Sequence, residues 1–238
     1  MELHVGTSGF SYKEWKGTFY PVDLPNKDML SYYGERLGAV EINNTFYRLP
    51  KMSVLESWAE QVPDSFRFSI KASRKITHFT RLQAGSQDQT EYLLSALGSL
   101  GDHLGVLFFQ LPPNFKKDIE RFAGFLRMLP EGTPAAWEFR HESWYDDEVY
   151  DLLRDRAQAL VCADTEEAGD DEPILHTAPW GYLRLRRPTY DHGDLERWAR
   201  SVAAQEWERA FIFFKHEDEG AGPQMADRFA RIAGEETS

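Results

Sequence analysis

The sequence predicts an α/β fold, a single (β/α)8 TIM-type barrel, and three observations support this prediction. Eight strand-like segments alternate with helix-like segments over the 238 residues, and no linker-like stretch divides the chain. Ionisable residues fall at the carboxyl ends of these strands, where barrel enzymes keep their sites. The alternation weakens after the sixth strand, where we expect an irregular or missing helix. We expect one domain over residues 1–234 and a frayed tail over 235–238, with an open doubly wound sheet as the alternative fold.

In the first half of the chain, strand-like segments end in polar turns and precede apolar residues at helical spacing. Apolar and polar residues alternate over Phe66–Lys71, as in a strand with one buried face. Ser53 and Glu56 form a capping box that predicts a helix. The loop Ala72–Gln87 is long enough to be functional or flexible. The expected strands are Leu3–Ser8, Ala39–Asn43, Phe66–Lys71 and Leu104–Gln110, with helices over about 27–37, 53–61 and 88–100.

The second half repeats this pattern with one acidic interruption. Apolar residues at helical spacing predict a helix around Ile119–Leu129. Ala135–Trp144 begins with strand-like residues, ends in ionisable ones and precedes a helix over about 146–156. The segment Glu166–Pro173 is too short and polar for a full helix. The remaining strands are Ala159–Asp164, Tyr182–Arg186 and Phe211–Lys215, and the last helices cover about 194–205 and 223–234.

Composition and charge limit the classes of function. A hydrophobic fraction of 42% with 14% aromatic residues is ample for a packed core. The net charge of −12 disfavours extensive nucleic-acid binding through bulk positive charge. The single cysteine, Cys162, excludes an internal disulfide and a cysteine-rich zinc site. We see no signal peptide in MELHVGTSGF and no membrane-spanning run, so a cytoplasmic protein is expected.

The alternation of side chains along each strand determines which of them point into the barrel. Positions facing the helices should be apolar, so Val40 and Ile42 point outward and Glu41 and Asn43 point inward. Lysines and arginines outnumber carboxylates among the inward residues of this acidic chain, which indicates an anionic ligand such as a phosphate or carboxylate. The same rule assigns inward positions to Ser69, Lys71, Gln110, Glu138, Arg140, Cys162, Asp164, Tyr182, Arg184, Arg186 and Lys215.

Each of these signals also has a structural explanation. Glu138 with Arg184, or Asp164 with Arg186, would form ion pairs inside the barrel. The turn Gly6–Gly9 has the composition of a phosphate cradle, but a tight turn is its commoner use. The aromatic residues that would stack on a sugar or base, or simply pack loops, are Tyr12, Trp15, Tyr47 and Trp144. The histidines that suit metal ligation less well than hydrogen bonding or acid–base chemistry are His78, His141 and His216.

An ordered set of motifs spans nearly the whole chain. The motifs are Gly6–Tyr12 (GTSGFSY), Val40–Pro50 (VEINNTFYRLP), Phe68–Ala72 (FSIKA), Ile76–His78 (ITH), Phe109–Pro113 (FQLPP) and Glu138–Trp144 (EFRHESW). This set resembles the YecE-like proteins, domain-of-unknown-function family 72. The resemblance implies a TIM-type barrel and carries over no catalytic role.

Two departures from that family pattern add positive charge near the proposed site. Where many members continue the seventh strand with a His-Gly pair, this chain has Arg186 and Arg187. Where many members end the eighth strand in paired asparagines, this chain has Lys215 and His216. The departures indicate that the ligand differs from that of other members.

The leading functional hypothesis is an enzyme that acts by general acid–base chemistry on a small anionic substrate, phosphorylated or carboxylated and sugar-like. In this hypothesis Glu41 or Glu138 is the base and His141 or Lys71 is the acid. The residues expected to bind the ligand are Asn43, Tyr47, Gln110, Arg140, Asp164, Arg184, Arg186 and Lys215, with Arg140, Arg184 and Lys215 on the anionic group.

Two alternatives remain open at this stage. The first is a metal-dependent phosphoesterase or nuclease, for which the candidate ligands are Glu41, Glu138, Asp164 and His141. The second is a non-catalytic ligand-binding or adaptor protein. No metal site and no cofactor are predicted, although a divalent metal is compatible with the first alternative. The sequence does not determine the oligomeric state.

Overall fold

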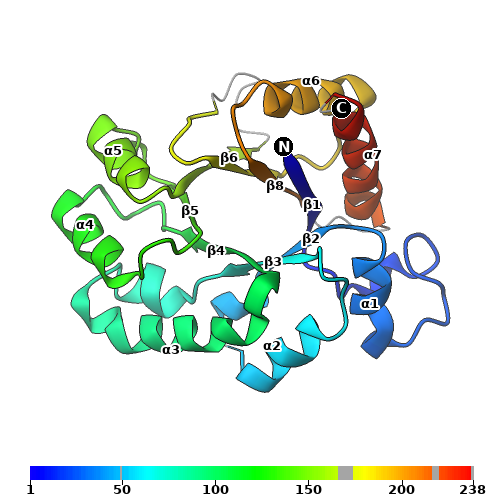
Figure 1. Cartoon of the computed structure of the whole chain (residues 1–238), viewed down its shortest axis with the longest axis horizontal. Helices are drawn as coiled ribbons and strands as arrows, with labels where there is room; N and C mark the ends of the chain where they lie inside the picture. The colour runs from blue at the N-terminus through cyan, green and yellow to red at the C-terminus, as the bar shows by residue number, and fades with distance from the viewer. Residues whose placement is uncertain (49, 166–173, 216–219, 237–238) are drawn as a thin grey trace.

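Parallel strands close into a barrel in the computed structural model, which describes residues 1–48, 50–165, 174–215 and 220–236 (Figure 1). Each strand pairs with its neighbours in chain order, and the last strand pairs with the first. The eight strands of the described residues are β1 Glu2–Ser8, β2 Ala39–Ile42, β3 Arg67–Lys71, β4 Leu104–Gln110, β5 Ala135–Glu138, β6 Ala159–Asp164, β7 Trp180–Leu185 and β8 Arg209–Phe214. The predicted TIM-type barrel is confirmed.

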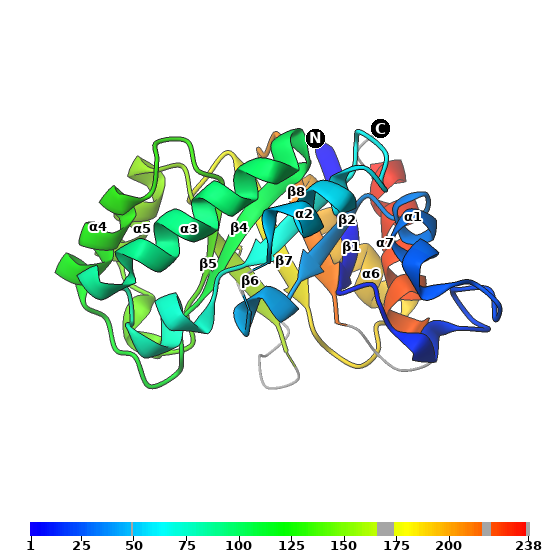
Figure 2. The same cartoon turned by 90° about the horizontal axis from the view of Figure 1, so that it is seen from below.

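Helices cover the outside of the barrel, as the two views in Figures 1 and 2 show. In the described ranges they are α1 Met29–Gly34, α2 Met52–Ala59, α3 Gln87–Leu97, α4 Ile119–Met128, α5 Asp147–Asp155, α6 His192–Ala203 and α7 Ala221–Glu236. Between β6 and β7, the described residues 165 and 174–179 form no helix, as predicted, and Glu166–Pro173 lie outside the described residues. No helix in the described ranges is long and apolar enough to cross a membrane.

Several helix boundaries differ from the prediction. Helix α2 begins at Met52 and its N-cap residue, Lys51, makes no capping hydrogen bond through its side chain. The predicted capping box is therefore wrong, because Ser53 already lies inside the helix. The segment predicted as a long loop contains helical turns at Lys75–Phe79 and Ala84–Ser86. Helix α7 continues two residues beyond Gly234, and residues 237–238 lie outside the described residues.

Apolar side chains form separate layers inside and outside the strands. Val106, Phe108 and Phe213 belong to a buried cluster that fills the barrel. Val40 and Phe109 belong to a larger cluster between strands and helices. The predicted alternation of inward and outward residues therefore holds in β2 and β4. It also holds in β3, β5 and β7, where the outward apolar residues are Phe68, Ile70, Trp137, Leu183 and Leu185.

Strand β6 faces the other way from the prediction. Cys162 packs in the outer apolar cluster, whereas Ala159 and Val161 pack inside the barrel. The Asp164 carboxylate lies on the same outward face as Cys162 and accepts a hydrogen bond from Trp198 of helix α6. The prediction that Cys162 and Asp164 point inward is wrong. The residues on both faces of β6 are small or apolar, so their alternation carries little information about which face is buried in the barrel.

A close contact between β1, β2 and α1 depends on a glycine. The Tyr33 hydroxyl donates to the Ala39 carbonyl oxygen at 2.9 Å and accepts from the Thr7 backbone N–H at 2.8 Å. Gly6 pairs with Ala39 across the two strands. A β-carbon at Gly6 would lie 1.7 Å from the Ala39 oxygen and 2.9 Å from the Tyr33 hydroxyl. The absence of a side chain at Gly6 therefore lets helix α1 join the two strands that carry Ser8 and Glu41.

We predict that Gly6→Ala lowers the free energy of unfolding by about 3 kcal/mol, because a backbone oxygen cannot move away from the new methyl group. Gly124→Ala in helix α4 is the matched control, since the nearest atom to its β-carbon is the end of the Arg127 side chain at 3.8 Å. The control should be neutral or stabilising by up to about 1 kcal/mol. Urea unfolding measures both. Equal stability of the two variants would contradict the close-contact explanation.

Candidate functional site

Polar side chains from several strands meet at the carboxyl-terminal end of the barrel, which we call the mouth. Their central member is Arg184 of β7, whose side chain is only 2% exposed. We call the set around it the charged cluster; its members are Glu41, Lys71, Gln110, Glu138, Arg140 and Arg184, from the ends of β2, β3, β4, β5 and β7.

The Arg184 guanidinium holds two buried carboxylates. Its Nε and Nη2 donate to Oε2 and Oε1 of Glu41, both at 2.9 Å, in a bidentate pair. Its Nη1 donates to Glu138 Oε2 at 2.5 Å. The ring of Phe108 lies below, with its centre 4.7 Å from the guanidinium carbon. The predicted ion pair of Glu138 with Arg184 is present, and Glu41 shares it.

Glu41 is saturated with hydrogen bonds. Within the described residues it accepts two from Arg184 and one each from Ser8 Oγ, Asn43 Nδ2 and Tyr182 OH, at 2.8–2.9 Å. Burial alone would raise the pKa of Glu41, but Arg184 and the bond from Asn43 outweigh burial and lower this pKa to about 2. Glu41 is therefore a permanently ionised acceptor and a weak base.

Tyr182 connects Glu41 to the opposite side of the barrel interior. Its hydroxyl lies 2.7 Å from Ser69 Oγ and donates to Glu41 Oε2 at 2.8 Å. Burial and then the Glu41 charge raise the pKa of Tyr182 well above its usual value. The phenol consequently remains protonated and serves as a donor.

Glu138 is held from both sides. Its Oε1 accepts from Gln110 Nε2 at 2.7 Å and from Arg140 Nε at 3.0 Å, while Oε2 accepts from Arg184. Burial favours a raised pKa for Glu138, but Arg184 and Arg140 together lower it. Because Gln110 donates to Glu138, its amide oxygen faces the other way and accepts from Lys71 Nζ at 2.9 Å.

Lys71 is a buried amine at the mouth with few partners. Its side chain nitrogen lies 4.7 Å from the centre of the Phe46 ring and 5.5 Å from that of Phe108. Burial, followed by the neighbouring charge of Arg184, lowers the pKa of Lys71 to about 8. Lys71 therefore exchanges its proton close to neutral pH, unlike the two glutamates.

Two further arginines add positive charge to the mouth. Arg140 is 44% exposed and uses its Nε on Glu138. Arg186 is half-buried, and in the described part of the chain its guanidinium has no hydrogen-bond or ion-pair partner. Burial and then Arg184 lower the pKa of Arg186. Among the described residues of the mouth, two carboxylates, Glu41 and Glu138, thus face four cationic groups, so this described cluster carries an excess of positive charge.

Asp164 does not belong to this cluster. Its Oδ1 accepts from Arg187 Nε at 2.8 Å, and its Oδ2 accepts from Tyr190 OH at 2.9 Å and Trp198 Nε1 at 3.2 Å. The predicted pair of Asp164 with Arg186 is not formed, because Arg187 takes this position. Through these contacts Asp164 connects the end of β6 to the segment after β7 and to helix α6.

Other predicted site residues have different partners. The His141 Nδ1 accepts from the Ser143 backbone N–H at 3.1 Å and caps the turn Glu142–Trp144. His78 Nδ1 lies 2.9 Å from Thr77 Oγ1. Tyr47 is 66% exposed, beside the guanidinium of Arg74. Of the three, His141 has a structural role, as the cap of this turn.

The remaining predictions concern Lys215 and the metal ligands. Lys215 is half-buried at the end of β8, and its backbone N–H donates to the Leu185 oxygen. The four candidate metal ligands do not gather, and within the described ranges no group of three or more His, Cys, Asp or Glu side chains is placed to hold a metal ion. His216 lies outside the described residues.

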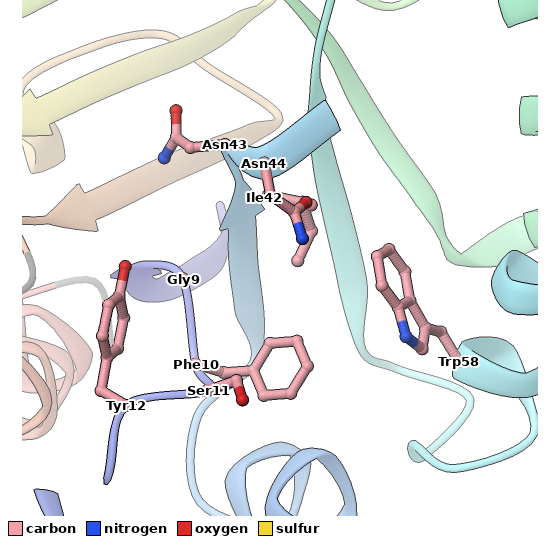
Figure 3. Close-up of a pocket in the computed structure, with 8 residues that line it drawn as sticks. All are labelled: Gly9, Phe10, Ser11, Tyr12, Ile42, Asn43, Asn44 and Trp58. Atoms are coloured by element: carbon pink, nitrogen blue, oxygen red, sulfur yellow. The ribbon is translucent and has the colours of Figure 1, made fainter. Parts of the chain in front are cut away.

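A cavity of about 400 Å³ adjoins the charged cluster. Figure 3 shows the ring of Trp58 facing the cavity from α2, Tyr12 on the other side, and Asn43 and Asn44 at the end of β2. Asn43 links the two regions, because it lines the cavity and donates to Glu41. The full lining is Gly9, Phe10, Ser11, Tyr12, Ile42, Asn43, Asn44 and Trp58.

The sequence indicated only part of this cavity. Tyr12 was an expected stacking residue and Asn43 an expected ligand-binding residue. Trp58 gave no signal, since a tryptophan on a helix is most simply explained as core. Its ring stacks on Phe68, with centroids 5.9 Å apart, and its other face is left toward the cavity.

Comparison with known proteins gives relatives along the whole chain. Residues 4–238 match the sequence family described as "Protein of unknown function DUF72". The UPF0759 protein YecE of Escherichia coli (strain K12) is 32% identical over 144 residues, which are 60% of this chain and 50% of YecE. The UPF0759 protein YunF of Bacillus subtilis (strain 168) is 24% identical over 156 residues, 63% of this chain and 54% of YunF. The matches span about half the length of each relative.

A solved structure shares the fold. The crystal structure of a DUF72 family protein from Thermotoga maritima MSB8 has a TM-score of 0.84 and 24% sequence identity. The match covers 98% of this chain and 100% of that one. At this sequence identity, the likeness supports the barrel architecture alone.

We predict that Arg184→Met lowers the free energy of unfolding at pH 7 by about 3–5 kcal/mol, because it leaves Glu41 and Glu138 buried without their cation. In the wild type the pKa of Glu41, about 2 against the usual 4.5, contributes stability that is present above about pH 5 and lost as the pH falls toward 2. Without Arg184, burial raises both pKa values, so protonation at low pH stabilises the variant. The stability difference should therefore shrink as the pH falls.

Urea unfolding between pH 7 and pH 4 measures this difference. Arg127→Met is the matched control, since Arg127 is exposed on α4. The control should remain within about 0.5 kcal/mol of the wild type at every pH. A penalty for Arg184→Met that stays constant with pH would contradict the assigned ion pairs.

We also predict that Asp164→Asn lowers the free energy of unfolding by about 2 kcal/mol, because charge-assisted hydrogen bonds from Arg187, Tyr190 and Trp198 weaken. Asp155→Asn, at an exposed position at the end of α5, is the control and should have little effect. Thermal and urea unfolding provide the comparison. If Asp164→Asn unfolds with the same free energy as the wild type, the contacts of Asp164 do not stabilise the connection between β6, the segment after β7 and α6.

Proposed function

The chain belongs to the DUF72 family, whose function is unknown. From the geometry of the mouth we propose that it is an enzyme acting on a small anionic substrate there. The reaction is acid–base chemistry in which Lys71 exchanges the proton. The substrate is phosphorylated or carboxylated, with an uncharged, sugar-like body.

One observation carries the anionic part of this proposal. Arg186 is half-buried at the mouth, and among the described residues its guanidinium has no partner. The charges of Glu41 and Glu138 act on Arg186 without direct contact, and Arg184 holds both carboxylates. A partly buried charge without a direct partner is costly, so a ligand that supplies one is the explanation we favour. A planar guanidinium suits the paired oxygens of a phosphate or carboxylate.

The proton-transfer role goes to Lys71 because of its pKa. At about 8, this pKa is closer to neutral pH than those of the two glutamates, and efficient acid–base catalysis requires such a value. Glu41, with a pKa of about 2 and five hydrogen bonds, orients Arg184 and does not accept a proton from the substrate. Glu138 positions Arg140 and Gln110 in the same way. His141 is the less suitable acid, since its Nδ1 caps a turn.

The cavity beside the charged cluster supports the proposal that part of the substrate is uncharged. Phe10, Tyr12 and Trp58 supply aromatic faces, and Asn43 and Asn44 supply amide donors and acceptors (Figure 3). Aromatic faces with a few polar groups are typical of sites for small uncharged rings. The lining contains no lysine, arginine, aspartate or glutamate, so the anionic group belongs at the mouth and the body in the cavity.

A thermal-shift screen tests the proposal with glucose 6-phosphate, gluconate, pyruvate and uncharged glucose. A ligand at about 100 times its dissociation constant stabilises the protein by ~2.7 kcal/mol, which raises the melting temperature by roughly 5–10 °C for a domain of this size. We expect a shift with at least one anion and none with glucose. Arg186→Gln should remove the shift, because the anion loses its charge partner.

The control is Arg67→Gln, which removes a partly buried arginine at the opposite end of β3, where Arg67 donates to Asp64 and Phe66 oxygens. The ligand-induced shift should be unchanged in this variant. Equal loss in both variants would contradict the site. A shift that requires Mg²⁺ or Mn²⁺ would favour the metal-dependent alternative, and binding without turnover would favour the non-catalytic one.

A further inference from the structure

Among the described residues Lys71 makes one hydrogen bond through its nitrogen, although an ammonium group has three N–H donors. Its side chain is 9% exposed, and in the described part of the chain its nitrogen donates only to Gln110 Oε1, at 2.9 Å. The described residues place no carboxylate oxygen within 4 Å of it. A buried ammonium in that state leaves two N–H donors unsatisfied, which is unfavourable. The site fits a nitrogen that carries one N–H better than one that carries three.

The surroundings of Lys71 also favour its neutral amine. The ring centres of Phe46 and Phe108 lie 4.7 and 5.5 Å from the nitrogen, and their faces attract a cation but accept no conventional hydrogen bond from it. Burial is the main cause that lowers the pKa of Lys71 to about 8; the charges of Arg184 and Arg140 also lower it, while those of Glu41 and Glu138 raise it. Burial in an apolar pocket and a neighbouring cation are the two conditions that make a lysine nucleophilic near neutral pH.

We infer that Lys71 is a nucleophile that forms an imine with the carbonyl carbon of an anionic aldehyde or ketone. The inference rests on the proposed function, since it uses the same mouth and names the substrate class. It goes further, because acid–base catalysis alone requires no covalent bond to the enzyme.

The covalent step balances without any other reactant. The Lys71 nitrogen bonds to the carbonyl carbon, and the carbonyl oxygen becomes a hydroxyl group that takes one proton from the nitrogen. The carbon–oxygen bond then breaks, and the oxygen leaves as water with a second proton from the nitrogen. No group is oxidised or reduced. Starting from the ammonium form, the product is an iminium with the same charge and one N–H.

The iminium product matches the protein groups around it. Its single N–H keeps the one hydrogen bond of Lys71, to Gln110 Oε1, and no donor is left over. Gln110 is oriented for this contact because its amide nitrogen is held by Glu138 at 2.7 Å. The neighbouring positive charges had opposed the ammonium. They oppose the iminium equally. The iminium is therefore favoured over the ammonium only because its hydrogen bonding is complete.

The position of the arginines defines the substrate further. Arg140 and Lys71 are linked through two residues, because Arg140 and Gln110 both donate to Glu138 Oε1 and Gln110 accepts from Lys71. Arg186 follows Arg184 by two residues at the end of β7. Arg140 is anchored through Nε, and in the described residues its terminal nitrogens make no hydrogen bond. An anionic group on Arg140 and Arg186 places a nearby carbonyl carbon at Lys71. Short 2-oxo acids and phosphorylated ketoses have this arrangement.

Reductive trapping tests the inference. The protein is incubated with sodium cyanoborohydride and pyruvate, dihydroxyacetone phosphate or uncharged acetone, and labelled lysines are located by peptide mass spectrometry. We expect Lys71 to be labelled at least about tenfold faster than Lys75, an exposed lysine four residues along. Pyruvate identifies a carboxylate site and dihydroxyacetone phosphate a phosphate site, whereas acetone should label Lys71 no faster than Lys75.

Two variants sharpen the result. Lys71→Arg keeps the positive charge but cannot form the imine, so labelling at this position should disappear. Arg140→Gln should slow labelling of Lys71 by about tenfold or more, because one charge-assisted contact with the anion is lost. The location of labelled lysines in the wild-type protein tests whether Lys71 forms an imine, even where a variant is poorly folded.

Binding of two anions without a carbonyl group separates the inference from the proposed function. Lactate and glycerol 3-phosphate carry the same anionic groups and are tested by thermal shift with and without Arg186→Gln. If either binds in an Arg186-dependent way while Lys71 is labelled no faster than Lys75, the imine is wrong and the anion site stands. If neither binds and Lys71 is not labelled, both are wrong.

Discussion

The buried guanidinium of Arg184 is the constraint on which the rest of the mouth depends. An arginine side chain does not lose its proton in a protein, so a position with 2% exposure requires fixed negative partners. Glu41 and Glu138 provide them from β2 and β5, and the three strands are thereby joined across the barrel. The orientations of Ser8, Asn43, Tyr182 and Gln110 follow, because each completes the hydrogen bonding of one of these carboxylates.

The same constraint explains how a protein with a net charge of −12 has, among its described residues, a positive cluster at the mouth. Arg184 engages both carboxylates of the charged cluster and Arg140 shares Glu138, so little negative charge remains for Lys71 and Arg186. Burial and the charge of Arg184 lower the pKa of Lys71, while the arginines remain charged. The distribution of charge within a few side chains, and not the total charge of the chain, therefore determines which ligands suit the site.

Much of the fold could be predicted because the barrel repeats one simple pattern. In β2 to β5 and β7, bulky apolar residues mark the outward face, and the inward position of Glu41, Glu138 and Arg184 follows from it. Strand β6 lacks this contrast between its two faces. Which face points outward is determined by Tyr190 and Trp198, which lie far along the chain and bind Asp164 on the outside of the barrel. Local alternation contains no information about such partners.

The site was predictable as a set of residues but not as a set of roles. The ion pair of Glu138 with Arg184 could be anticipated, since alternation along the strands places both residues inward and their charges are opposite. The saturation of Glu41 and the choice of Arg187 over Arg186 as partner of Asp164 depend on side-chain geometry. The cavity beside Trp58 depends on how α2 packs against β3.

Stability alone does not account for the polar layer at the mouth. The layers beneath it are apolar, with Phe108, Phe211 and Phe213 inside the barrel. Replacing a buried ion-pair network by apolar residues of similar volume is often neutral or stabilising, and branched apolar residues ordinarily fill the interior of such barrels. A barrel selected only for stability would extend the apolar layers to its end. The change to charged residues occurs at the end where barrels bind ligands, beside a cavity and a cationic excess among the described residues, and this placement supports the proposed ligand site.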